Sequence, residues 1–270
     1  MRLRIRHSTV YAYEFPIRSA VQLLRMTPRD HEGQYVGAWR VEIEGEGRLR
    51  AGEDSLGNVT HALYVDGPVS KIRVTVHGEV DVVETHGVVR GAIERFSPEV
   101  FLRETSLTDH NPDMLAFLAE LDPQGADRLA FLHRLMAALF ERIEFRAGAT
   151  VTETTAGQAF LQQQGVCQDF AHMFVALARR AGVPARYVSG HLFRHEGAIE
   201  QEAAHAWAEA FVLDVGWIGF DVANGVCPTD CYVRVAVGLD YLGAAPVRGS
   251  RTGGGRENME VALSVAGKVQ

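Results

Sequence analysis

A cysteine at the start of a predicted helix is the residue best placed for chemistry. Apolar residues recur at three- and four-residue steps from Phe170 to Ala181, which predicts a helix that begins at Cys167. Gly182 and Pro184 end the pattern. Unpaired backbone N–H groups and the positive end of the helix dipole favour a thiolate at this position. Cys167 is therefore a candidate nucleophile, and a buried structural cysteine is the alternative for any cysteine taken alone.

A cysteine nucleophile needs a base to take its proton and a third group to hold that base. His205 begins a predicted strand, and Asp221 ends the next one, with fifteen residues between them. In an antiparallel hairpin the two side chains would face each other, and the helix could bring Cys167 to the other ring nitrogen. The sequence thus predicts a Cys–His–Asp site, although His205 alone would be a structural histidine and Asp221 alone a turn residue.

Four segments around these residues closely resemble the bacterial transglutaminase-like family. They are GVCQDFAH at 165–172, GVPARYVSG at 182–190, HAW at 205–207 and GWIGFD at 216–221. The resemblance extends over residues 105–247, and the preceding segment looks like the N-terminal region often joined to this core in bacteria. It implies a papain-like core in which Cys167 is the nucleophile, His205 is the general base and then acid, and Asp221 is the orienting carboxylate.

The resemblance also limits the reaction. Members of the family include peptidases and amidases besides cross-linking enzymes, so it implies acyl transfer from an amide or peptide carbonyl through a thioester. Hydrolysis is favoured over amine cross-linking, because nothing in the sequence identifies an amine-binding site. The expected substrate is a peptide, a protein or a small amide. The alternative is a non-catalytic binding or assembly module that uses the β domain, and the intact Cys–His–Asp set argues against it.

Alternating apolar and polar residues predict an antiparallel β domain over residues 1–104. About six strands are expected before Thr85. Turn residues at 54–58 and at 66–68 are expected to separate some of them.

The core, residues 105–247, is predicted to combine helices with strands, which gives an α+β fold. Asp127 is a plausible cap for a helix at 127–143, and a capping box begins at Thr155. A shorter helix is predicted at 112–120. Strands are predicted at 185–193, 205–212, 215–221 and 232–237.

Residues 248–270 are predicted to form a flexible tail that ends in a strand. The segment 249–256 is rich in glycine, which is typical of a flexible chain. Residues 259–265 alternate again, so a final strand is expected to complete a sheet.

Composition limits the partners and the compartment. The formal net charge of −7 argues against nucleic acid or an anionic membrane as the main partner. Three cysteines are an odd set rather than a disulfide framework, which favours a reducing compartment. Neither a signal peptide nor an apolar run of about 18 residues is recognisable. We therefore expect a soluble cytoplasmic protein without a cofactor.

Two further cysteines, Cys227 and Cys231, have no predicted role in the reaction. They could bind a metal with His191 or His195, but zinc normally has four ligands and no second pair of ligands is evident. Incidental loop cysteines are the favoured interpretation, with a reversible disulfide as another alternative. No metal site is predicted.

Other residues near the motifs are interpreted as follows. His172 lies just over one helical turn beyond Cys167 and is expected to be structural. Asp169 is expected to be structural as well, because a carboxylate in the first helical turn complements the dipole. Gln164 is a candidate for the side chain that stabilises the oxyanion. Trp207 and Trp217 either line the cleft or pack.

Overall fold

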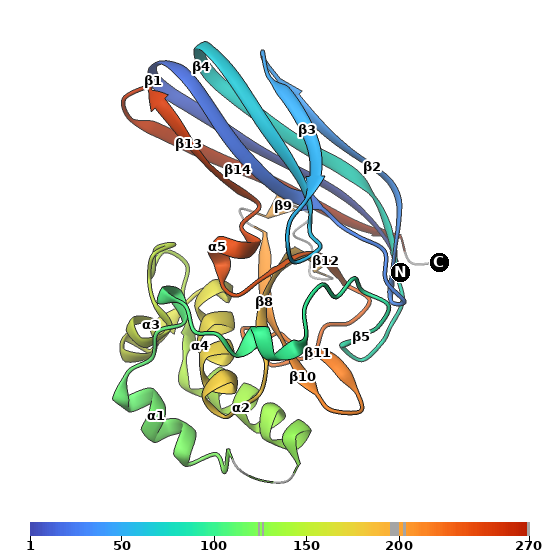
Figure 1. Ribbon diagram of the computed structural model, residues 1–270, viewed down its shortest axis with the longest axis vertical. Coiled ribbons are helices and arrows are strands. Elements are labelled where there is room, and N and C mark those ends of the chain that lie inside the picture. Colours follow the sequence, from blue (N-terminus) through green and yellow to red (C-terminus); the bar gives the residue numbers. More distant parts are fainter. Residues whose placement is uncertain (124, 126, 195–199, 202–203, 269–270) are drawn as a thin grey trace.

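The chain folds into two main antiparallel sheets, one of which is covered by helices (Figure 1). The computed structural model describes residues 1–270 except 124, 126, 195–199, 202–203 and 269–270. This arrangement confirms the predicted α+β class. Within the described part of the chain, no helix is both long and apolar enough to cross a membrane.

The large sheet has seven strands in the order β2–β4–β1–β14–β9, with β3 paired to β4 and β13 paired to β1. Their bounds are β1 (Arg2–Thr27), β2 (Gln34–Glu44), β3 (Arg48–Glu53), β4 (Val59–Val82), β9 (Glu200–Gln201), β13 (Val247–Gly253) and β14 (Glu257–Lys268). Leu3 and Ile5 are buried while Arg2 and Arg4 are exposed, so the period-two pattern does separate a core face from a solvent face.

The N-terminal segment contains fewer and longer strands than expected. Residues 1–85 form four strands instead of about six, because β1 and β4 pair along nearly their whole lengths. The predicted turn at 66–68 is wrong, since these residues lie inside β4, where pairing with β1 continues across a register shift. The turn at 54–58 is confirmed, and it joins β3 to β4.

The prediction of a flexible tail is wrong, whereas the final strand is confirmed. β13 pairs with β1 from Leu24 to Ile17, and β14 pairs with β1 from Tyr13 to Arg2. Gly253, Gly254 and Gly255 adopt positive φ values of 84°, 93° and 63°, which turn the chain from β13 into β14. Glycine serves tight turns as well as loose linkers, and composition does not distinguish the two uses. The C-terminal segment therefore completes the N-terminal sheet.

The smaller sheet belongs to the helix-containing part of the chain, here called the core, and has the strand order β12–β8–β10–β11–β5. Its strands are β5 (Val88–Val89), β8 (Ala185–Leu192), β10 (His205–Val212), β11 (Gly216–Phe220) and β12 (Tyr232–Gly238). The helices are α1 (Pro112–Ala119), α2 (Arg128–Arg142), α3 (Ala156–Gln162), α4 (Cys167–Arg180) and α5 (Tyr241–Ala244). Short elements complete it: η1 (Pro98–Leu102), η2 (Ser106–Thr108), and the parallel pair β6 (Glu144–Phe145) and β7 (Gln164–Gly165).

The predicted helix starts are confirmed by their caps. Asp127 accepts a hydrogen bond of 2.9 Å from the N–H of Ala130 at the start of α2. At the start of α3, Thr155 and Gln158 form both halves of a capping box. Buried apolar residues of α4 and of β10 and β11 share one cluster, so α4 lies against the sheet that holds the predicted base and carboxylate.

Two buried amide side chains join the large sheet to the core. Gln34 of β2 donates to the carbonyl of Arg234 at 2.9 Å and accepts from its N–H at 2.8 Å. Asn58, just before β4, pairs in the same way with the carbonyl and N–H of Val237, both at 2.8 Å. Each amide thus satisfies one donor and one acceptor of β12, as a neighbouring strand would. These contacts fix how the large sheet sits on the core.

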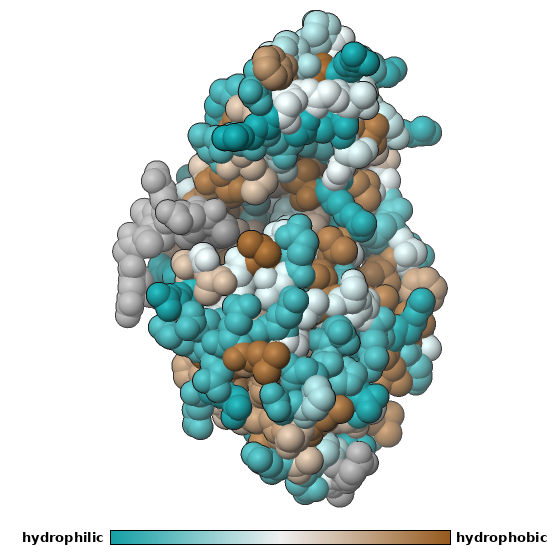
Figure 2. All heavy atoms as spheres, turned by 90° about the vertical axis from the view of Figure 1, so that its left-hand side faces the viewer, coloured by the Kyte–Doolittle hydropathy of each residue, from teal (hydrophilic) through white to brown (hydrophobic). Residues whose placement is uncertain are grey.

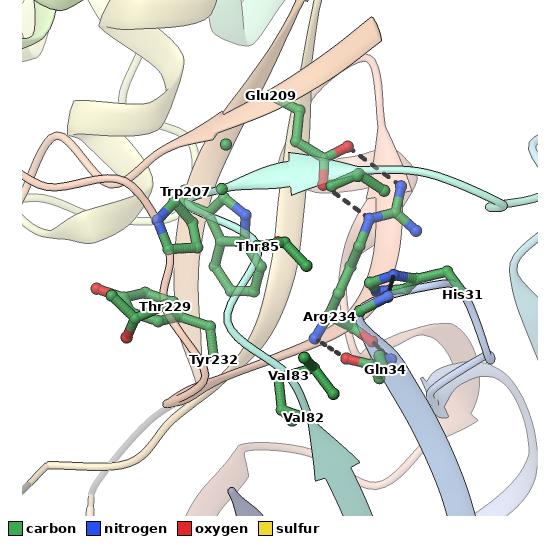
Figure 3. Close-up of a pocket in the computed structure, with 15 residues that line it drawn as sticks. His31, Gln34, Val82, Val83, Thr85, Trp207, Glu209, Thr229, Tyr232 and Arg234 are labelled. Carbon is green, nitrogen blue, oxygen red and sulfur yellow. Dashed lines mark hydrogen bonds and ion pairs between the residues drawn. The ribbon is translucent and has the colours of Figure 1, made fainter. Parts of the chain in front are cut away.

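A buried ion cluster lies beside this junction (Figure 3). The Glu209 carboxylate is fully buried and accepts from Nε of Arg186 and Nε of Arg234, both at 2.7 Å. Burial alone would raise the pKa of Glu209, but the charges of Arg234 and Arg186 outweigh it and lower the pKa. Arg186 also makes a two-pronged pair with Glu94 and lies over the ring of Trp217, 3.8 Å from its centroid. Trp217 therefore packs in this cluster.

Removing the central carboxylate is expected to destabilise the fold strongly. Glu209→Gln should lower the free energy of unfolding by about 3–5 kcal/mol, because a buried ion pair broken on one side leaves charge uncompensated. The Arg48–Asp66 pair, with both side chains 78% exposed, provides the control. Asp66→Asn should cost less than about 1 kcal/mol. Urea unfolding measures both, and equal losses would contradict the assignment.

Candidate active site

Cys167 is the first residue of α4, as predicted. The chain enters the helix through Val166, whose N–H donates to Oδ2 of Asp169 at 2.8 Å, and Thr150 donates to the same oxygen at 2.6 Å. A Cβ on Gly165 would come within 2.7 Å of the Asp169 Cβ, so the preceding position needs glycine. Asp169 holds the start of the helix, which agrees with a structural role, and leaves Cys167 at the helix N-terminus.

His205 and Asp221 are brought together, although not as direct cross-strand partners. His205 Nε2 lies 2.6 Å from Oδ2 of Asp221, and both side chains are buried. The last ladder pair between β10 and β11 joins Ala208 to Phe220, so the two side chains meet diagonally beyond the end of the ladder. The predicted contact is therefore present, and its predicted register is slightly wrong.

Two residues that sequence reasoning missed complete the surroundings of Asp221. Its Oδ2 also accepts from the hydroxyl of Tyr232 at 2.8 Å and from Nδ2 of Asn224 at 2.6 Å. Burial alone would raise the pKa of Asp221, but the hydrogen bonds and charge of His205, with those of Asn224 and Tyr232, lower it. Asn224 follows Asp221 in a tight turn, a pattern that sequence could have flagged. Tyr232 comes from β12, which has no local signal of this role.

The His205 ring lies between the carboxylate and the thiol. Burial alone would lower its pKa, but the hydrogen bonds and charges of Asp221 and Cys167 raise the pKa to about 10. Since Nε2 is taken by Asp221, Nδ1 is the ring nitrogen left to exchange a proton with Cys167, which lines the same cavity. The rings of Trp207 and Tyr232 pack beside His205, with centroids 6.2 and 5.9 Å away. Trp207 is 3% exposed, so it packs against the site.

Cys167 and His205 open onto a cavity of about 260 Å³. The cavity is lined on the core side by α4 and β8 and on the other side by strands of the large sheet. Cys167 is partly exposed, so a ligand in this cavity can reach the sulfur. The arrangement has a nucleophile, a proton carrier and an orienting carboxylate beside an accessible space.

The other residues considered near the site have different surroundings. Gln164 does not line this cavity, and its Oε1 accepts from Arg146 at 3.2 Å, so its proposed oxyanion role has no geometric support. His172 is fully buried and accepts from the N–H of Tyr241 at 3.0 Å. Burial, assisted by the charge of Arg179, lowers the pKa of His172 to about 3. His172 is therefore a neutral structural residue.

The cysteines outside the site form no disulfide. Cys227 and Cys231 are not bonded to each other, and the described residues contain no group of three or more side chains placed to hold a metal. His191, one suggested ligand, is buried against the rings of His7 and Trp39. His195, the other, lies outside the described residues.

Two regions of the chain match known families. Residues 3–81 match the bacterial transglutaminase-like N-terminal region, and residues 116–222 match the transglutaminase-like superfamily. The second range includes Cys167, His205 and Asp221.

Individual proteins extend these matches. A protein of Mycobacterium leprae is 30% identical over 278 residues, which cover 98% of each chain. A protein-glutamine gamma-glutamyltransferase of Pseudomonas aeruginosa is 28% identical over 172 residues, covering 56% of this chain and 25% of that protein. The solved structure of a "putative cysteine protease" from Cytophaga hutchinsonii has a TM-score of 0.78 at 19% identity and covers 100% of this chain and 92% of its own. This last likeness shows a shared fold.

The raised pKa of His205 can be measured directly. The ring should stay protonated well above pH 7, because its pKa lies near 10 when Asp221 and Cys167 flank it. Asp221→Asn removes the charge and should lower that pKa by about 1–3 units. Asp214→Asn, in the exposed turn of the same hairpin, should leave it unchanged. Titration of the ring nitrogens by NMR distinguishes these results, and an unshifted value in Asp221→Asn would contradict the geometry.

Proposed function

Because the chain belongs to the transglutaminase-like superfamily and carries the bacterial N-terminal region of that family, we propose that it is a cysteine-dependent acyl-transfer enzyme. Its substrate is an amide or peptide, and its intermediate is a thioester on Cys167. The observation that carries this proposal is the position of the His205 ring, which hydrogen-bonds to Asp221 and lines the same cavity as Cys167.

The proposed reaction has two steps. The Cys167 thiolate attacks the carbonyl carbon, and the tetrahedral intermediate collapses as His205 donates a proton to the departing amine. Water then attacks the thioester while His205 takes a proton from it, and the collapse of the second tetrahedral intermediate releases a carboxylic acid and restores the Cys167 thiolate beside the protonated ring. Asp221 keeps the ring oriented and stabilises its positive charge throughout.

The negative charge that develops on the carbonyl oxygen needs a hydrogen-bond donor to stabilise it. The first N–H groups of an α-helix have no acceptor within the helix, and the N–H of Cys167 is the first of α4. This group is our proposed oxyanion donor, assisted by the helix dipole.

Water is the proposed acceptor because of the residues around the sulfur. No aspartate or glutamate is among the described residues that line the cavity beside Cys167, so no carboxylate is placed to hold the ammonium group of an amine acceptor there. Hydrolysis therefore stands ahead of cross-linking in this proposal. Cys227 and Cys231 form no disulfide, which fits a reducing compartment, and a cytoplasmic location is part of the same proposal.

Turnover of peptide amides tests the proposal. Wild-type protein should release amine from at least one member of a peptide-amide library, and Cys167→Ala should abolish this release. His205→Ala should reduce it by about 10²–10⁴-fold, because general acid–base catalysis typically contributes that much. Cys227→Ala is the matched control, since it removes a free cysteine that lies outside the cavity.

Product analysis in the presence of an added primary amine identifies the acceptor. The carboxylic acid should dominate over the new amide. If the new amide dominates, the reaction is assigned as cross-linking instead of hydrolysis. Amine release that survives Cys167→Ala would overturn the proposal as a whole.

A further inference from the structure

The cavity beside Cys167 is one end of a longer groove. A second cavity of about 590 Å³ shares five lining residues with it, and these residues lie where the large sheet faces the core. The shared residues are Tyr11, Thr152, Tyr241, Val247 and Met259. Figure 2 shows the surface hollowed between the sheet above and the core below, with apolar residues gathered around the hollow. The two cavities therefore form one groove that leads to the sulfur.

The large sheet supplies one complete wall of this groove. Thr9 and Tyr11 of β1 lie on the same face as Met259 and Val261 of β14, because each pair is two positions apart along its strand. β1 pairs Thr9 with Val261 and Tyr11 with Met259, so the four side chains form a compact patch. Hence residues at both ends of the sequence come within reach of a ligand on Cys167.

The groove carries exposed apolar side chains on both walls. Met259, on the sheet wall, is 56% exposed, and Leu242, on α5 of the core wall, is 38% exposed. Apolar side chains left in water along a groove that leads to a reactive sulfur are a cost that a bound apolar ligand would remove. Their positions on opposite walls suit a chain that runs between them.

Apart from the reacting pair Cys167 and His205, the charged side chains among the described lining residues lie at the outer end of the groove. The described residues that line the inner cavity include no lysine, arginine, aspartate or glutamate. Burial lowers the pKa of His7, which lines it, to about 4, so this ring is neutral at pH 7. At the outer end Arg251 is paired with Glu257 at 3.1 Å, and the Glu153 carboxylate accepts a hydrogen bond from the Thr152 hydroxyl at 2.9 Å. An ionised substrate side chain near the sulfur would thus find no partner besides the Cys167–His205 pair, whose opposite charges compensate each other, and would lose its hydration.

We propose that the large sheet is half of the substrate site and selects a peptide with an apolar residue on the acyl side of the cleaved bond. Met259 and Leu242 are the specificity-determining residues that contact this part of the chain. The inference rests on the proposed acyl-transfer function and adds the substrate class to it. It also assigns a role to the N-terminal segment, which together with the C-terminal strands builds the wall opposite Cys167.

A peptide series with one fixed fluorogenic amine as leaving group tests the proposal. The residue on the acyl side is leucine, phenylalanine, glutamine, aspartate or lysine. We expect kcat/KM for leucine or phenylalanine to exceed that for aspartate and lysine by about 100-fold or more, since the inner end offers an apolar surface and no charge besides the mutually compensated Cys167–His205 pair.

Variants then locate the source of the preference. Met259→Asp and Leu242→Asp should each lower kcat/KM for the preferred peptide by about 10-fold or more. Both side chains are partly exposed, so these changes should leave the fold intact. The matched controls are Val21→Asp and Leu161→Asp, because these exposed apolar residues lie on β1 and α3 outside both cavities. The controls should retain wild-type kinetics.

Alkylation of Cys167 by iodoacetamide separates failure of this inference from failure of the proposed function. The alkylation rate should be the same in wild type, Met259→Asp and Leu242→Asp, because the reagent is too small to need the groove. Turnover without an apolar preference, or turnover unaffected by both variants, would overturn the inference and leave the function intact. Alkylation without turnover of any peptide would remove the proposed function and the inference with it.

Discussion

The buried Asp221 carboxylate is the group on which the site depends. It is fully excluded from water and is satisfied by His205, Tyr232 and Asn224, which come from three different parts of the chain. An uncompensated charge in such a place would cost several kcal/mol, so these partners and the carboxylate require one another. These hydrogen bonds hold the His205 ring in one orientation. The position of the ring in turn determines where proton transfer to and from Cys167 can occur.

The second requirement is that the large sheet be held against the core. Gln34 and Asn58 achieve this by pairing with the backbone of β12, the strand that also begins with Tyr232. Apolar residues of both sheets bury one another in a shared cluster, among them Ile5 of β1 and Val233 of β12. The wall of the groove and the support of Asp221 are therefore parts of one junction.

Features that depend on neighbouring residues, such as helix starts, can be predicted from the sequence. Features that depend on which distant strands pair cannot. The helix at Cys167 and the capping residues at Asp127 and Thr155 were predictable, because periodicity and caps act within a few residues. The role of Tyr232 was not, since it depends on β12 pairing with β8 and not with β11. The glycine-rich segment at 249–256 was misjudged, because composition does not show that β13 and β14 have a partner in β1.

A covalent intermediate on one sulfur is the central claim, and rapid-quench mass spectrometry of the intact protein tests it most directly. During turnover of a peptide amide, the protein should gain the mass of the acyl portion, and proteolytic mapping should place that mass on Cys167. Steady turnover with no added mass at any quench time, or with the mass on another residue, would contradict it.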